Sequence, residues 1–445
     1  MSDTTHRNIA ESKFSLSERE EVFDQIVASF KQGYAWWGEQ LSREALISLA
    51  THNIETDSTV ERTSEYTHTP RVRRHLMVYA PRGWYKSTVM EIMAKLVGDD
   101  PENGRVGKVG TVSEAAFRGT VNDNGDFVPP EAMTKDILFF DEFGTVATDE
   151  DLLQVMNQLM ESGEATVNLS KIASMGSKQQ YHLEQKYNRL KFVNGELDKA
   201  RKATPGEDID FDEIGSASKF YYQSKPIMWA CTYKQEHIQD AANASRWSPV
   251  FMKKKPTAAN LTKHVNRNSF SVNEDTIRLF RQVLNDTGIP SDADSNKLQQ
   301  ALAGDLTAVQ IPERFYDENP EMDGRMSAQI KQYILGLRWW GKDPSDRDID
   351  QLVDNITRLN DMAEEGEPET AIGATEQLII DSPLKVKHIA EKTGYSKKRI
   401  YDALEEIEES IYGDPTDDRI VDFDRDDSRR VIWTSKGQKT AYEST

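Results

Sequence analysis

The chain has 445 residues, of which 37% are hydrophobic and 29% charged, and its net charge at pH 7 is −20. No apolar stretch is long enough for a membrane span, and residues 1–14 lack the apolar core of a secretory signal. We therefore expect a cytoplasmic protein without a membrane partner. The single cysteine, Cys231, excludes an internal disulfide and a cysteine-rich zinc site. The acidic balance means that any contact with DNA must come from a local basic site.

Residues 1–70 are predicted to form a short helical region. Ser17 and Glu20 have the spacing of a capping box ahead of apolar residues at helical spacing. A second helix is expected over residues 42–50. The tryptophans between the two helices, Trp36 and Trp37, are interpreted as core or interface packing in preference to a ligand site.

From residue 71 the pattern becomes α/β. Apolar runs at 75–80, 137–140 and 226–232 predict buried strands, and the first run is followed by a predicted helix at 87–97. A strand, a glycine-containing turn, a helix and a further strand are typical of the start of a nucleotide-binding sheet.

After residue 270 the sequence predicts a helical region, followed by a linker and a separate C-terminal unit. Residues 270–360 have helical periodicity, and 364–375 form a predicted linker because they are acidic and contain Gly and Pro. Residues 376–445 predict helices and a hairpin, with strands at 419–424 and 429–434.

The turn after the first strand resembles a phosphate-binding P-loop. Such a loop curls backbone N–H groups around phosphates, and it supplies a lysine for the β and γ phosphates and a hydroxyl for Mg²⁺. Lys86 and Ser87 fit these roles, although Ala80 and Tyr85 stand where glycines are expected. A strand–turn–helix with an incidental lysine is the alternative. The predicted ATP-binding residues are Ala80, Pro81, Arg82, Gly83, Trp84, Tyr85, Lys86, Ser87 and Thr88.

Two acids, Asp141 and Glu142, end the strand at 137–140. Hydrolysis of ATP needs one acid near Mg²⁺ and another that polarises the attacking water. We assign Asp141, with Ser87, to the metal and Glu142 to the water. The alternative is a pair of acids that cap a surface turn.

Together these motifs resemble AAA+ ATPases. The stretch 109–128 and the stretch 158–171 are similar to the helix insertion and the pre-sensor hairpin of the minichromosome maintenance (MCM) helicase family. The resemblance covers about residues 75–260. The chain departs from the family in its P-loop glycines, and it has neither space before residue 71 for the family's large N-terminal domain nor that domain's zinc-binding cysteines.

The resemblance implies an α/β fold with an AAA+ P-loop core at 71–260, a helical lid at 261–363 and, after the linker, a winged-helix domain at 376–445. It also implies roles for single residues. Thr232 would be a sensor of the γ-phosphate, and Arg246, within Ser245-Arg246-Trp247, would be an arginine finger that reaches a neighbouring subunit. Arg325 is a candidate second sensor, with Arg347 as its rival. A finger that acts on a neighbour implies a ring, which in this family is a hexamer.

Three further predictions concern DNA. By the resemblance Lys171 would face single-stranded DNA in the pore of the ring, and an ordinary exposed lysine is the alternative. In the winged helix Lys397, Lys398 and Arg399 are expected to contact duplex phosphates, whereas the acid-rich surroundings leave docking of a partner protein open. Residues 177–202 are expected to form an inserted helix with many basic residues, interpreted as a solvated helix in preference to a DNA contact.

The sequence therefore predicts an ATP- and Mg²⁺-dependent, ring-forming DNA helicase or translocase that acts in DNA replication with partner proteins. Two alternatives stay open. A viral DNA-packaging ATPase is one, because Ala-Pro-Arg-Gly ahead of Lys-Ser-Thr also resembles terminase P-loops. The other is a nucleotide-gated DNA-binding or loader protein without robust turnover.

Overall fold

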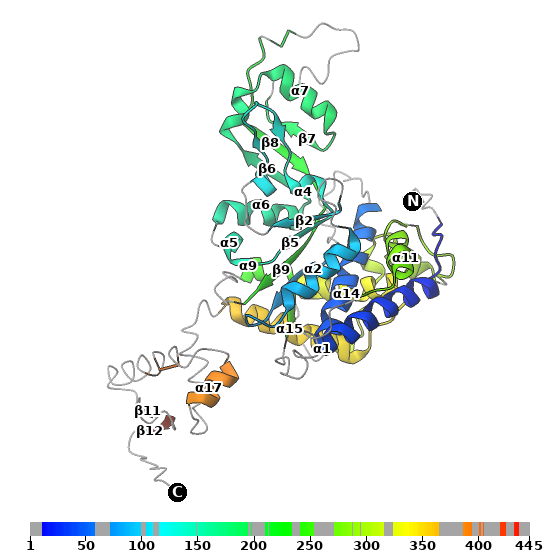
Figure 1. The fold of residues 1–445 in the computed structure, drawn as a ribbon, viewed down its shortest axis with the longest axis vertical. Coiled ribbons are helices and arrows are strands. Elements are labelled where there is room, and N and C mark those ends of the chain that lie inside the picture. Colours follow the sequence, from blue (N-terminus) through cyan, green and yellow to red (C-terminus); the bar gives the residue numbers. More distant parts are fainter. Residues whose placement is uncertain are drawn as a thin grey trace. The chain divides into compact units, whose positions relative to one another are not determined.

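The structure is a computed structural model (Figure 1). It divides into two compact units, residues 1–360 and 361–445, which are described separately. Among the described residues, no helix is both long and apolar enough to cross a membrane. The described residues are 11–57, 72–98, 104–109, 115–147, 149–194, 197, 210–211, 213–233, 241–252, 271–286, 288–293, 295–315, 324–364, 386–393, 400–401, 404, 419–423 and 431–435.

The first unit has a mixed α/β fold that contains a five-stranded parallel sheet. Its strands stand in the order β10-β1-β9-β5-β2. The strands predicted at 75–80, 137–140 and 226–232 are confirmed, and their continuous apolar runs are typical of parallel strands covered on both faces. The bounds are β1 (His75–Tyr79), β2 (Val106–Val109), β5 (Ile137–Phe140), β9 (Ile227–Thr232) and β10 (Trp247–Phe251).

Alternate residues of these strands face two different cores. Val78, Phe139 and Trp229 belong to one large hydrophobic cluster with the flanking helices. On the other face Phe140 stacks on Phe117, with 5.9 Å between ring centroids. The helices of the first core are α1 (Leu16–Asp57), α2 (Lys86–Val97), α11 (Glu274–Leu284) and α14 (Gly324–Trp339).

Helix α1 differs from its prediction in two details. The two predicted helices form one element that is kinked at Ala35, whose φ is 55°. The capping box consists of Ser15 and Glu18, not Ser17 and Glu20: the Ser15 N–H donates to Glu18 Oε2 at 2.8 Å, and the Glu18 N–H donates to Ser15 Oγ at 3.2 Å. The helix thus begins earlier than the apolar periodicity indicates, because the first turn is polar.

Helix α1 lies very close to α14. Gly336 of α14 sits where an added Cβ would be 2.7 Å from the Ile47 carbonyl oxygen, so only glycine fits. Trp37 is buried at 1% exposure, which confirms its prediction as core packing. The described residues of the range 270–360 are helical where they form regular structure, as predicted, and add α12 (Asn296–Leu302), a 3₁₀ helix (Leu306–Ala308) and α15 (Asp346–Glu364).

Short elements lead from β2 toward β5 and then to α6 (Glu150–Glu161). A small hairpin forms where the MCM-like insertion was predicted, and the Asn122 side chain closes its turn by accepting the Asp126 N–H at 2.8 Å. These elements are α3 (Ala115–Arg118), β3 (Thr120–Val121), β4 (Phe127–Val128), α4 (Glu131–Thr134) and α5 (Gly144–Ala147). Helix α9 (Ala241–Ala244) precedes β10.

Between α6 and β9 the chain forms a second, antiparallel sheet in the order β6-β8-β7, at the upper end of Figure 1. The helix predicted at 177–202 is confirmed over 177–186 and wrong over 187–194, because α7 ends at Lys186 and β7 begins at Leu190. Buried Leu190 and Phe192 alternate with exposed Lys191, and this period of two is that of a strand. The elements are β6 (Glu164–Asn168), a 3₁₀ helix (Ser170–Ser174), α7 (Ser177–Lys186), β7 (Leu190–Phe192) and β8 (Lys219–Gln223).

In the second unit the described elements are α17 (Val386–Thr393), β11 (Arg419–Phe423) and β12 (Val431–Ser435). The two strands pair antiparallel, as the predicted hairpin requires. These elements do not by themselves show a winged helix. The predicted DNA contacts Lys397, Lys398 and Arg399 lie outside the described residues.

Candidate functional site

Three strands of the parallel sheet end together at one edge. The Ala80 N–H, just after β1, donates to the Thr232 carbonyl at 3.2 Å, and the Phe143 N–H, after β5, donates to the Cys231 carbonyl at 3.0 Å. From β1 the chain leads to β2 on one side, whereas from β9 it leads past β1 to β10 on the other. The carboxyl ends of strands at such a reversal form the crevice in which open α/β sheets bind ligands.

The loop after β1 has the backbone conformation of a tight phosphate-type turn. Gly83 has φ 78°, and Tyr85 has φ 60° and ψ 17°, the left-handed region. That region costs a residue with a side chain about 1–2 kcal/mol. Tyr85 therefore holds a conformation that glycine adopts freely, at the position where the P-loop pattern expects glycine. Such strain is concentrated at functional sites.

Lys86 is the first residue of α2, and its side chain is turned into the edge of the sheet. The residue is 7% exposed. Burial lowers the pKa of its ammonium, while Cys231, Asp141 and Glu142 act in the opposite direction. Lys86 is therefore a buried cation beside the two carboxylates at this edge of the sheet.

Ser87, the next residue, lies against β9. Its hydroxyl hydrogen-bonds with the thiol of Cys231, and burial raises the pKa of that thiol to about 12, so the thiol is neutral at physiological pH. Thr232, the last residue of β9, is fully buried. The predicted residues Lys86, Ser87, Asp141 and Thr232 are thus gathered at the ends of neighbouring elements.

The two acids follow β5. Because β9 stands between β1 and β5, two inter-strand spacings of roughly 5 Å each separate the loop from the acids. Glu142 is exposed, and its Oε1 lies 3.6 Å from Nη2 of Arg82 in the loop. Of the other predicted loop residues, Ala80 is buried, Pro81 is exposed, and Trp84 and Thr88 are half-buried.

Sequence reasoning missed Tyr233, which directly follows Thr232. The Arg82 guanidinium lies over its ring, 4.0 Å from the centroid, and donates to its hydroxyl. Lys86 Nζ is 5.8 Å from the same centroid. An aromatic residue next to the predicted sensor at a strand end was the available signal.

The predicted arginines Arg246, just before β10, and Arg325, at the start of α14, come together at Glu161, the last residue of α6. Arg246 Nη2 lies 2.6 Å from Glu161 Oε1, and Arg325 Nη2 lies 3.6 Å from the same oxygen. Arg325 also donates to the Ser245 hydroxyl. One carboxylate of the same chain therefore holds the candidate finger and the candidate second sensor. Lys171 is elsewhere, exposed in the 3₁₀ helix after β6, and Arg347 is exposed on α15.

The donor set suits Mg²⁺ in the presence of phosphates. Within the described residues no group of three or more His, Cys, Asp or Glu side chains could hold a metal ion alone. Magnesium usually takes one or two protein oxygens and completes its shell with phosphates and water. The Ser87 hydroxyl and the Asp141 carboxylate match that requirement.

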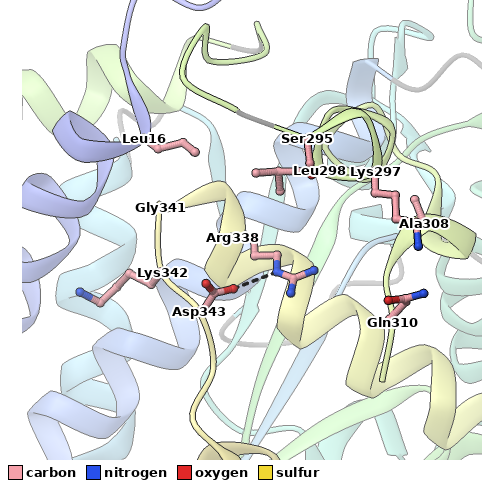
Figure 2. A pocket seen from close by; sticks show the side chains of 10 residues that line it. All are labelled: Leu16, Ser295, Lys297, Leu298, Ala308, Gln310, Arg338, Gly341, Lys342 and Asp343. Carbon is pink, nitrogen blue, oxygen red and sulfur yellow. Dashed lines mark hydrogen bonds and ion pairs between the residues drawn. The ribbon is translucent and has the colours of Figure 1, made fainter. Parts of the chain in front are cut away.

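A cavity of about 360 Å³ lies away from this edge (Figure 2). It is lined by residues of α1, α12 and α14 and of the turn after α14, where Arg338 Nε donates to Asp343 Oδ1 at 3.0 Å. None of the predicted site residues lines it.

Comparisons with known proteins add little. No protein-family model and no curated protein matches the chain. One similar solved structure is described as a "putative ATPase" from Cytophaga hutchinsonii. It is 11% identical, with 77% of this chain and 86% of that chain covered, and the TM-score is 0.38. A TM-score this low does not establish a shared fold.

Proposed function

We propose that the protein is a P-loop ATPase whose catalytic centre is the carboxyl edge of the parallel sheet. One observation carries this proposal: Lys86, buried at the start of α2, shares that edge with Asp141 and Glu142. A lysine and a carboxylate pair behind a strained loop provide phosphate binding and water activation together.

Each residue then has a task. Lys86 and the backbone N–H groups of residues 83–88 bind the phosphates, with the first turn of α2 directed at them. Ser87 and Asp141 would hold Mg²⁺, which supplies charge neutralisation on the phosphates when bound. Glu142 orients the attacking water, and Thr232 contacts the γ-phosphate.

We propose further that the ATPase is an MCM-like AAA+ DNA helicase or translocase that acts in replication as a ring, hexameric as in that family. The support is the resemblance, together with the position of the second sheet between α6 and β9, where the resemblance requires a DNA-contacting hairpin. In this proposal Lys171 contacts a single strand, the C-terminal unit binds duplex or a partner protein, and Arg325 is a second sensor. Arg246 reaches a neighbour's γ-phosphate after it leaves Glu161.

A second candidate function has its own observation. Arg82 forms an ion pair with Glu142, the acid assigned to the water, and Tyr85 and Ala80 replace P-loop glycines. These features favour a nucleotide-gated DNA-binding or loader protein that holds ATP without turning it over.

The test compares Lys86→Ala with Lys95→Ala, a lysine on the same helix that is 58% exposed. We expect Lys86→Ala to lower phosphate release by about 100-fold or more, since a positioned cation at the reacting group contributes at this scale. Lys95→Ala should turn over like the parent. Parental turnover in Lys86→Ala would refute the site. Tight ATP binding without phosphate release in the parent would instead favour the loader function.

Mixed rings test the role of Arg246. Subunits with Arg246→Ala mixed with subunits with Lys86→Ala should regain part of the activity, because some interfaces receive an intact loop and an intact finger. Rings made of Lys86→Ala subunits alone are the matched control, because none of their interfaces has an intact loop. Mixed rings that form and stay inactive at every ratio would contradict action on a neighbour.

A further inference from the structure

The antiparallel sheet β6-β8-β7 uses only one of its faces for packing. On that face Phe220, Tyr222 and Phe192 are buried, and the Phe127 ring lies 5.6 Å from Phe220. The opposite face is open to solvent. Its side chains are exposed or half-buried: Glu164, Thr166 and Asn168 of β6, Lys219, Tyr221 and Gln223 of β8, and Lys191 of β7.

The register sets an aromatic ring among basic groups on this open face. Tyr221 stands directly opposite Thr166 on one side and Lys191 on the other. Lys219, two residues away on the same strand, shares the face. Arg189 is just ahead of β7, and its carbonyl accepts the Gln223 N–H at 2.9 Å. Directly opposed side chains are about 5 Å apart, so the ring and the lysines form one patch.

The charges of this patch are not neutralised within the described part of the chain. Arg189, Lys191 and Lys219 form no ion pair there, and Tyr221 forms no hydrogen bond through its hydroxyl. The acid on the face, Glu164, accepts a hydrogen bond from the Gln223 amide at 3.1 Å. A patch of unpaired cations is notable on a chain with a net charge of −20.

We infer that this face binds single-stranded DNA, with a base stacked on Tyr221 and phosphates on Arg189, Lys191 and Lys219. Sequence-tolerant binding of single strands combines a basic surface that follows the backbone with aromatic rings on which bases stack. The face is distinct from Lys171 in the 3₁₀ helix. The choice of DNA over RNA rests on the proposed function, whereas the contacts themselves do not.

The experiment measures binding of a labelled oligo-dT of about 30 nucleotides to the full chain by fluorescence anisotropy without ATP, over a range of salt. The triple variant Arg189→Ala, Lys191→Ala, Lys219→Ala should bind more weakly. Its log–log salt slope should be flatter by about 0.7 for each lost phosphate contact. A Lys31→Ala, Lys297→Ala variant removes exposed lysines from α1 and α12 and should match the parent. Parental affinity and slope in the triple variant would overturn the inference.

Tyr221 separates stacking from charge. Tyr221→Ala should weaken binding by about 5- to 150-fold, as expected for loss of one base–aromatic stack, and Tyr221→Phe should bind like the parent. Equal binding of Tyr221→Ala and the parent would overturn the stacking role, as would parental affinity for duplex equal to that for oligo-dT. Stronger binding of oligo-rU than of oligo-dT would overturn the choice of DNA. The binding titration contains no nucleotide, so its result does not depend on whether the protein hydrolyses ATP. The ATPase test with Lys86→Ala and this binding test can therefore fail independently.

Discussion

The two larger sheets of the first unit differ in which of their faces are buried. The parallel sheet is apolar on both faces, with helices on one side and the Phe117–Phe140 stack on the other, and its polar groups lie at the strand ends. The antiparallel sheet is apolar on one face, and its polar groups lie along the strands. In the first sheet chemistry is confined to an edge, whereas in the second a whole face is available to a ligand. Burial therefore decides where each sheet can carry a functional site.

The sharpest test of this contrast is the removal of a large side chain from the parallel sheet. Trp229 is fully buried, and its Nε1 donates to Ser48 Oγ at 3.0 Å. We expect Trp229→Ala to lower the free energy of unfolding by about 3–5 kcal/mol, since it leaves a cavity and removes the hydrogen bond that the Ser48 hydroxyl accepts. Denaturant titration measures this loss. A cost below that of Tyr221→Ala would contradict the assignment of the parallel sheet as the rigid core.

A smaller effect compares two neighbours on β8. The Tyr222 hydroxyl donates to the Phe117 carbonyl at 2.8 Å in a buried setting, and burial raises the pKa of Tyr222 well above its ordinary value. Tyr222→Phe should cost about 1–3 kcal/mol, because the carbonyl loses its partner. Tyr221→Phe, on the open face, should change the free energy of unfolding by less than about 0.5 kcal/mol. Equal costs in the same titration would show that both faces are buried in solution.

The difference in burial between the two sheets also explains which strands could be predicted from the sequence. Strands buried on both faces are continuous apolar runs, so β1, β5 and β9 were predictable within a residue or two. Strand β7 was not, because a three-residue alternation after a true helix is too short to distinguish from a continued helix.

The site was predictable to the same extent. Lys86, Ser87, Asp141 and Thr232 each end a strand or begin a helix, and such positions can be found from local pattern alone. Tyr233 could not be assigned a partner, because its contact with Arg82 joins loops far apart in the sequence. The convergence of Arg246 and Arg325 on Glu161 likewise depends on tertiary packing. The left-handed backbone conformation of Tyr85 could not be predicted from the sequence, because a glycine is the usual signal for that conformation.

The contact of Gly336 with Ile47 also limits how the protein can be dissected. A fragment that starts at the first strand would lack α1 and would leave the apolar surface of α14 and α2 open to water, where it would favour aggregation. Helix α1 is in this sense an integral part of the core of the first unit. The smallest fragment suited to enzymology or crystallisation therefore keeps the N-terminal helix and is shortened only from the other end, after α15.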